Sequence, residues 1–247
     1  NYNANAYKEK GIVINDINSS LRFVILGDSH GVMWSNQITN ISHKLNATCH
    51  FFTMSGGQSP FFKIPIAVNE NPFNLSSEEQ LHYDKARLNI FTKYSTDLVI
   101  ISARWNNDHI NESKDLMNYL SLKNIPVLLL ECPPILKLGN QNVRQYLHWK
   151  KLDNKTSADN LIALECYQLN TNQGERFIVR KIANKYPNAR LLPTYDLYLH
   201  TFNKAKVVIN NEVLYLDDDH LTKAGTEIVS TRLIESIKSV TDIAEFK

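Results

Sequence analysis

The chain has 247 residues, and its 27 Lys and Arg nearly balance its 25 Asp and Glu. This length fits one α/β domain with a sizeable core, and the balanced charge, without a basic cluster, argues against nucleic acid as a partner. No apolar stretch approaches the ~20 residues that cross a bilayer, and residues 1–11 are too polar for a signal peptide. A chain that begins Asn-Tyr-Asn resembles a mature or excised piece, which is compatible with a removed signal or membrane domain.

The chain divides at about residue 20. Residues 1–20 are rich in Asn with little apolar pattern, so we expect an N-terminal extension or linker, followed by one domain over residues 21–247. Residues 21–26 form a nearly continuous apolar run that predicts a strand covered on both faces. The later pattern predicts strands over 47–54, 97–102, 125–130 and 189–192, helices over 29–45, 76–93, 158–185 and 221–240, and a hairpin over 207–215.

Strands that alternate with helices predict an α/β fold, a three-layer α/β/α sandwich with a mainly parallel central sheet. Such sheets bind ligands beyond the carboxyl ends of their strands. Ser29, Gly56 and Arg104 each follow an expected strand, so we expect all three at one edge of the sheet.

Three cysteines, Cys49, Cys132 and Cys166, are widely spaced and odd in number. Their spacing indicates neither a zinc site nor a full disulfide framework. One bridge with a free thiol and three buried thiols both stay open.

Two short motifs carry the chemistry. Gly27-Asp28-Ser29-His30 ends the first strand, where a serine on a tight strand-to-helix turn has an exposed hydroxyl and an N–H at a helix N-terminus. An Asp and a His three residues apart, Asp217 and His220, could supply the orienting carboxylate and the base of a Ser-His-Asp triad. Together they predict ester chemistry.

The polar neighbours of these motifs have ordinary structural interpretations. We expect Asp28 to hold the turn and Asp219 to cap the helix near Leu221. We expect His30 to make structural hydrogen bonds at a helix N-terminus. Asp218 and Asp219 compete with Asp217 for the triad position.

These motifs resemble the SGNH (GDSL-like) hydrolase superfamily, and more narrowly the extracytoplasmic SGNH domain fused to acyltransferase-3 membrane proteins. The narrower resemblance rests on Gly-Asp-Ser-His, on Ala103-Arg104-Trp105, and on residues 215–225 around Asp217 and His220. It implies a flavodoxin-like SGNH fold with Ser29 as nucleophile, His220 as general base and then acid, and Asp217 as the orienting carboxylate. The family spacing selects Asp217.

The donors for the oxyanion are less clearly marked. Ser29 N–H and Gly56 N–H are candidates, because a glycine lets the backbone approach the reacting centre closely. The superfamily's usual Gly-x-Asn-Asp block is replaced here by residues 102–105, with Asn107 just beyond. We expect Arg104 as the third donor, with Asn107 as the alternative, and Trp105 as a wall on which a sugar stacks.

The resemblance implies a serine-dependent O-acetyltransferase that modifies a bacterial surface polysaccharide such as lipopolysaccharide O-antigen. It uses no metal and no cofactor. Its partners would be a glycan acceptor and a fused acyltransferase-3 membrane domain that delivers the acetyl group, which puts this domain in the periplasm. A carbohydrate O-acetylesterase of the same fold is the alternative, because the triad does not choose between sugar and water.

Two further hypotheses come from other classes. Gly27-Asp28-Ser29-His30-Gly31 also fits the Gly-Asp-x-His-Gly opening of metallophosphoesterases, but the other two metal-binding segments of that family are missing from the sequence. An inactive glycan-binding module would not require an intact Ser29, Asp217 and His220.

Overall fold

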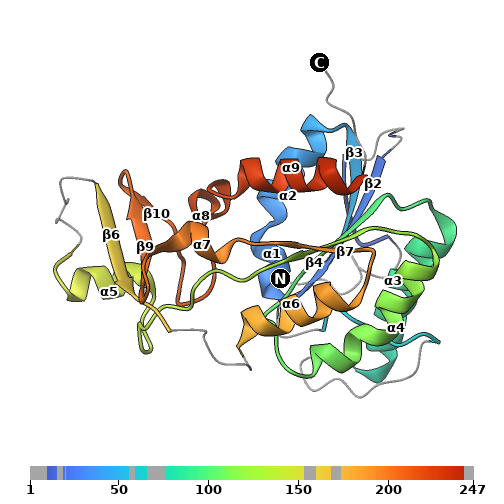
Figure 1. Cartoon of the computed structure of the whole chain (residues 1–247), viewed down its shortest axis with the longest axis horizontal. Coiled ribbons are helices and arrows are strands. Elements are labelled where there is room, and N and C mark those ends of the chain that lie inside the picture. The colour runs from blue at the N-terminus through green and yellow to red at the C-terminus, as the bar shows by residue number, and fades with distance from the viewer. Residues whose placement is uncertain are drawn as a thin grey trace.

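The structure, a computed structural model, describes residues 10–15, 19, 21–55, 59–65, 76–152, 160–167 and 174–241. Its central sheet has the strand order β1-β3-β2-β4-β5-β7, and all neighbours run parallel except β1 and β3 (Figure 1). The predicted α/β fold with a mainly parallel sheet is confirmed. The strands are β1 (Ile12–Ile14), β2 (Leu21–Gly27), β3 (Ala47–Thr53), β4 (Leu98–Ser102), β5 (Val127–Leu130) and β7 (Ala189–Leu192).

Alternating side chains of β2 show why the sheet is covered on both faces. Phe23 and Ile25 point into one apolar cluster, and Val24 and Leu26 point into another. Helices α2 and α9 cover the first face and α3, α4 and α6 cover the second, which gives the three layers. The helices are α1 (Ser29–Met33), α2 (Ser35–Lys44), α3 (Ser77–Lys93), α4 (His109–Leu122), α5 (Val143–Trp149), α6 (Glu175–Lys185), α7 (Tyr195–Tyr198), α8 (Lys223–Glu227) and α9 (Ser230–Thr241).

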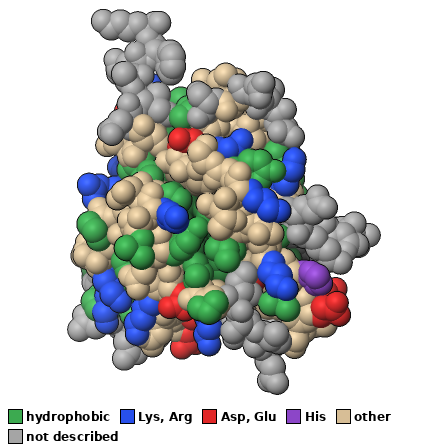
Figure 2. All heavy atoms as spheres, turned by 90° about the vertical axis from the view of Figure 1, so that its right-hand side faces the viewer, with side chains coloured by type: hydrophobic (Ala, Val, Ile, Leu, Met, Phe, Trp, Pro, Cys, Tyr) green, Lys and Arg blue, Asp and Glu red, His purple; other side chains and the backbone are tan. Residues whose placement is uncertain are grey.

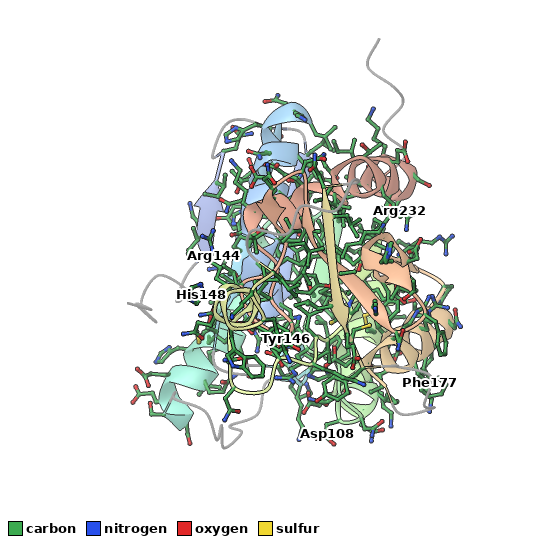
Figure 3. The ribbon with its side chains drawn as sticks, turned by 90° about the vertical axis from the view of Figure 1, so that its left-hand side faces the viewer. Asp108, Arg144, Tyr146, His148, Phe177 and Arg232 are labelled. Atoms are coloured by element: carbon green, nitrogen blue, oxygen red, sulfur yellow. The ribbon has the colours of Figure 1, made fainter. Side chains whose placement is uncertain are left out.

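A second, smaller sheet lies beyond one end of the central sheet and was not expected from the sequence (Figure 1). It contains β6 (Leu161–Glu165), β8 (Leu199–Thr201), β9 (Lys204–Ile209) and β10 (Glu212–Val213), with β9 at its centre. Figure 3 views this end: Arg144, Tyr146 and His148 of α5 lie on one side of β6, and Phe177 of α6 lies on the other.

Three predicted elements need correction. The helix expected over residues 158–185 is wrong, because Leu161–Glu165 is a strand and the helix begins only at Glu175. The helix expected over 29–45 is broken at Trp34, whose side chain is buried in the core and whose ψ of −7° departs from the value near −42° of a regular α-helix. The helix expected over 221–240 is also two helices, α8 and α9.

The N-terminal segment contributes to the sheet where it is described. Ile12–Ile14, within the expected extension, pairs with β3 as an edge strand. The division of the chain at residue 20 stays a prediction.

All three cysteines are buried free thiols, which decides between the two alternatives left open by their spacing. Among the described residues, no helix is long and apolar enough to span a membrane. On the face shown in Figure 2, Lys and Arg side chains are scattered among apolar and neutral ones.

Candidate active site

Ser29 is the first residue of α1, directly beyond the carboxyl end of β2. Asp28 caps this helix: its Oδ1 accepts the His30 N–H at 2.8 Å, and its Oδ2 accepts the Arg104 N–H at 2.9 Å. One buried carboxylate therefore ties the serine turn to the loop after β4. The expectation that Asp28 holds the turn is confirmed.

Gly27 lets this turn lie tightly against the neighbouring strand. A Cβ at Gly27 would overlap the Ser102 carbonyl oxygen and would lie 2.8 Å from Cα of Gly31. Because both obstacles are backbone atoms, a side chain here would push α1 away from the sheet.

The strand order explains why Ser29 and Arg104 share one edge of the sheet. From β2 the chain first adds β3 on one side, and then crosses to add β4 on the other. This is the topological switch point of a doubly wound sheet, the position at which such folds bind their ligands. Ser29 follows β2 and Arg104 follows β4, as expected.

The histidine comes from a closed loop that follows the second sheet. Tyr215 and Leu221 form a bridge across the loop, and the Leu216 N–H donates to the His220 carbonyl at 2.8 Å. Asp217 Oδ1 accepts the N–H groups of Asp219 and His220 at 3.1 and 2.8 Å. The Asp217 carboxylate thus shapes the turn that carries His220.

This loop brings His220 to Ser29 across 191 positions of sequence. His220 Nε2 lies 2.8 Å from Ser29 Oγ, and its Nδ1 lies 3.0 Å from both oxygens of Asp217. The order serine, imidazole and carboxylate is that of a nucleophile, its base and the group that orients the base.

The carboxylates around the ring change how it titrates. Contacts with Asp217 and Asp219 raise the pKa of His220 to about 10, although burial of the ring opposes the change. Burial would raise the pKa of Asp217, but hydrogen bonds from the His220 ring and from backbone N–H groups hold that pKa below its usual range.

We expected Asp219 to cap the helix near Leu221, but this prediction is wrong. The α8 cap is Thr222, whose hydroxyl accepts the Gly225 N–H at 3.0 Å. Asp219 is buried beside the imidazole instead, with Oδ1 2.8 Å from His220 Nδ1.

Arg104 reaches into the site as an ion-pairing group. Its Nη1 lies 3.4 Å from Asp219 Oδ2 and its Nε lies 3.6 Å from Glu175 Oε1, while its side chain is 60% exposed. These two carboxylates already engage the guanidinium. A role for Arg104 as oxyanion donor stays a prediction.

The other expected binding residues have different outcomes. Trp105 is buried and donates its Nε1–H to the Leu130 carbonyl at 2.9 Å, so its ring does not form an exposed wall for a sugar. Asn107 is exposed in the turn before α4, and its carbonyl accepts the Ile110 N–H. Gly56 lies outside the described residues.

Sequence reasoning missed Glu175. It was expected in the middle of a long helix, but it opens α6, with Gly174 at the cap position. A glycine before an acidic residue was the available signal for a helix start at this point. Burial raises the pKa of Glu175, although Cys132, His30 and Arg104 oppose this change.

Two groups of side chains in this region have the composition of a metal site. Ligand atoms of His30, Asp219 and His220 lie within 4.8 Å of one another, as do those of residues 217–219. Contacts within the site already engage two members of the first group, because Arg104 faces Asp219 and the two ring nitrogens of His220 face Ser29 and Asp217. We therefore assign no metal-binding role to the first group.

Comparisons with known proteins identify a family and a similar fold. A solved structure, "Structure of Salmonella ser. Paratyphi A lipopolysaccharide acetyltransferase periplasmic domain", is similar at a TM-score of 0.54 and 15% identity, over 95% of this chain and 87% of that one. At this identity the likeness shows the fold. No curated protein sequence matches the chain significantly. The family described as "SGNH domain (fused to AT3 domains)" matches residues 4–235. The chain belongs to this SGNH domain family.

Proposed function

We propose that this domain is an SGNH-type serine O-acyltransferase that transfers an acetyl group to a hydroxyl of a bacterial surface polysaccharide. The observation that carries the proposal is the 2.8 Å contact between Ser29 Oγ and His220 Nε2, with Asp217 3.0 Å from the opposite ring nitrogen. Such an arrangement supports nucleophilic catalysis through an acyl-serine intermediate.

The reaction would proceed in two half-reactions. Ser29 Oγ attacks the acyl carbonyl while His220 Nε2 takes the hydroxyl proton, and the imidazolium gives this proton to the leaving oxygen as the acyl-Ser29 ester forms. A glycan hydroxyl then loses its proton to Nε2 and attacks the ester, and His220 returns the proton to Ser29. Asp217 holds the ring in the tautomer that accepts the serine proton.

The tetrahedral intermediates need donors for their oxyanion. Ser29 N–H lies in the first turn of α1, where backbone N–H groups have no partner within the helix. We propose it as the first donor. Gly56 N–H, Arg104 and Asn107 are the candidates for the others.

The substrate class rests on the family and on the similar structure. The family is described as fused to AT3 domains, and the similar structure is the periplasmic domain of a lipopolysaccharide acetyltransferase. By this likeness we propose a glycan acceptor, an acetyl group delivered by an acyltransferase-3 membrane domain, and a location outside the cytoplasm.

Acetate release from an activated aryl acetate tests the chemistry. We expect slow hydrolysis that survives a chelator, because Ser29 and His220 suffice to form and break the acyl-serine ester. Ser29→Ala and His220→Ala should each abolish most of it. Ser77→Ala is the matched control and should keep full activity, because Ser77 is exposed and opens α3 as Ser29 opens α1.

Loss of activity on chelation, restored by Mn²⁺ or Zn²⁺, would contradict the proposal and favour a metallophosphoesterase. Rapid release of acetate with no transfer to any added glycan would instead favour the O-acetylesterase.

A further inference from the structure

His220 contacts a second carboxylate in addition to that of Asp217. Asp219 Oδ1 lies 2.8 Å from Nδ1, closer than either Asp217 oxygen at 3.0 Å. The directed hydrogen bonds of Nδ1 go to Asp217, whereas the contact with Asp219 is an ion pair. Two negative groups therefore face one imidazole nitrogen.

The two carboxylates differ in how deeply they are buried. The Asp217 side chain is 43% exposed, whereas the Asp219 side chain is 4% exposed. A charge interacts more strongly with a neighbour when water does not screen it. The buried charge of Asp219 is thus screened less by water than that of Asp217, and it can act strongly on the His220 ring.

The far oxygen of Asp219 has its own polar neighbours. Asp219 Oδ2 lies 3.5 Å from Nε2 of the fully buried His30 on α1 and 3.4 Å from Nη1 of Arg104 in the loop after β4. Both distances exceed those of ordinary hydrogen bonds, and within the described residues neither Oδ2 nor His30 Nε2, both of which are buried, has a hydrogen-bond partner. The Asp219 carboxylate therefore lies between polar side chains from two elements, His30 of α1 and Arg104 of the loop after β4.

The other ionisable groups around Asp219 complete the environment. His30 Nδ1 faces the buried Cys132 thiol at 3.7 Å, in the loop after β5, and Arg104 also pairs with Glu175 of α6. Burial raises the pKa of Cys132 well above its usual value, so the thiol adds no charge near neutral pH. Contacts with His220 and His30 hold the pKa of Asp219 below its usual range, against the effect of burial.

We propose that Asp219 is a second positioning carboxylate for His220, held in place by His30 and Arg104. It would keep the ring facing Ser29 and stabilise the imidazolium that forms when Ser29 gives up its proton. A purely structural role, as the partner of Arg104, is the alternative. This inference rests on the proposed function, since it assigns a role within the same site.

The test measures the titration of the His220 ring by NMR in protein with labelled histidines. The His220 signal is assigned by its loss in His220→Asn. In Asp219→Asn we expect the ring pKa to fall by about one unit or more, because one nearby negative charge is removed. Asp218→Asn, the neighbouring acidic residue of the same turn, is the matched control and should change the ring pKa far less.

Kinetics give the second readout. At the pH where the ring is neutral, kcat/KM for an activated acetate should fall at least about tenfold in Asp219→Asn, with little change in Asp218→Asn. An unchanged ring pKa in a destabilised Asp219→Asn would overturn the proposal and leave Asp219 as the structural partner of Arg104.

Two arrangements keep the test decisive. If Asp219→Asn does not fold, the wild-type titration can still overturn the proposal, because a ring pKa near 6.5 would mean that neither carboxylate acts on His220. The titration also needs no turnover. If the protein is inactive but the pKa of the His220 ring falls in Asp219→Asn, the result would contradict the proposed function while supporting the contact between Asp219 and His220.

Discussion

At the scale of single residues, the site depends on carboxylates with separate tasks. Asp28 joins α1 to the loop after β4 through two backbone N–H groups, and Asp217 accepts two more in the turn before His220. Both therefore position the reacting side chains through the backbone. Asp217 and Asp219 also face the imidazole directly.

Replacing Asp217 tests how the ring is oriented. Asp217→Asn should leave the fold intact but lower kcat for an activated acetate at least about 10²-fold, because an amide does not hold the tautomer that accepts the serine proton. The loss should be smaller than the ~10⁴-fold of a triad with a single carboxylate, since Asp219 still faces Nδ1. Steady-state kinetics with a thermal melt measures both quantities.

Asp218→Asn is the control for that change, because the Asp218 carbonyl, which accepts the Leu136 N–H, is kept in the variant. Equal losses in the two variants would mean that general negative charge in the turn, and not the carboxylate at Nδ1, supports catalysis.

The pH dependence of kcat/KM follows from the protonation state of the His220 ring. Its raised pKa keeps His220 protonated near neutral pH, whereas the base must be neutral to accept the serine proton. We therefore expect kcat/KM to rise with pH, about tenfold per unit, towards a plateau near pH 10. If kcat/KM already reaches its plateau by about pH 7, the His220 ring is not protonated at neutral pH, which would contradict this account.

The raised pKa of His220 also makes the stability of the fold depend on pH. Because the folded-state pKa of His220 is raised, its ion pairs stabilise the fold fully below the ordinary histidine value near 6.5. This contribution is lost as the pH rises towards about 10. The conditions of highest kcat/KM should therefore cost some stability, which thermal melts across this range can measure.

At the scale of elements, the close approach of α1 to β4 positions the nucleophile. Gly27→Ala should lower the free energy of unfolding by roughly 1–3 kcal/mol, because the new methyl group meets backbone atoms of Ser102 and Gly31. Activity should fall as well, since Ser29 lies two residues further on. Denaturant unfolding and ester hydrolysis measure the two effects.

Gly139→Ala is the control that separates a loss of stability from a loss of activity. Gly139 has a φ of +65°, and no atom of the described part of the chain lies within 4 Å of an added Cβ, so alanine there should cost about 1 kcal/mol in conformational strain alone. This variant should keep its activity. If Gly27→Ala is equally active, the tight turn does not position Ser29.

Much of the central sheet could be predicted from the sequence, because buried parallel strands are short apolar runs that depend little on their partners. The expected strand over 189–192 matches β7, and the hairpin over 207–215 is found as β9 and β10, with Asn210 and Asn211 at positive φ in its turn. Strand β6 could not be predicted, because Leu-Ile-Ala-Leu-Glu contains good helix formers. Its pairing with β9 overrides that preference.

The candidate site shows the same division. The grouping of Ser29, Asp217 and His220 could be predicted because these residues lie in short motifs with a fixed spacing. The environment of Asp219 could not, because its contacts come from α1, from the loop after β4 and from its own turn. Trp105 was misjudged for a related reason, since its burial depends on how α4 and the loop before it pack.

At the scale of the whole molecule, the site joins the two ends of the chain. Ser29 follows the second strand of the central sheet, while His220 follows the second sheet, 191 positions later. The 2.8 Å contact between them therefore exists only in the complete fold. This arrangement also places the candidate site at the switch point of the central sheet, the position at which doubly wound sheets bind their ligands.

In the proposed reaction Ser29 carries the acyl group, and trapping that ester tests the proposal most directly. The protein is mixed with an activated acetate, quenched in acid within the first turnovers, and digested for mass spectrometry. We expect one acetyl group per chain, on the peptide that contains Ser29, and none in Ser29→Ala. An acetyl group on another residue, or full hydrolysis by Ser29→Ala without a covalent intermediate, would contradict the proposed role of Ser29.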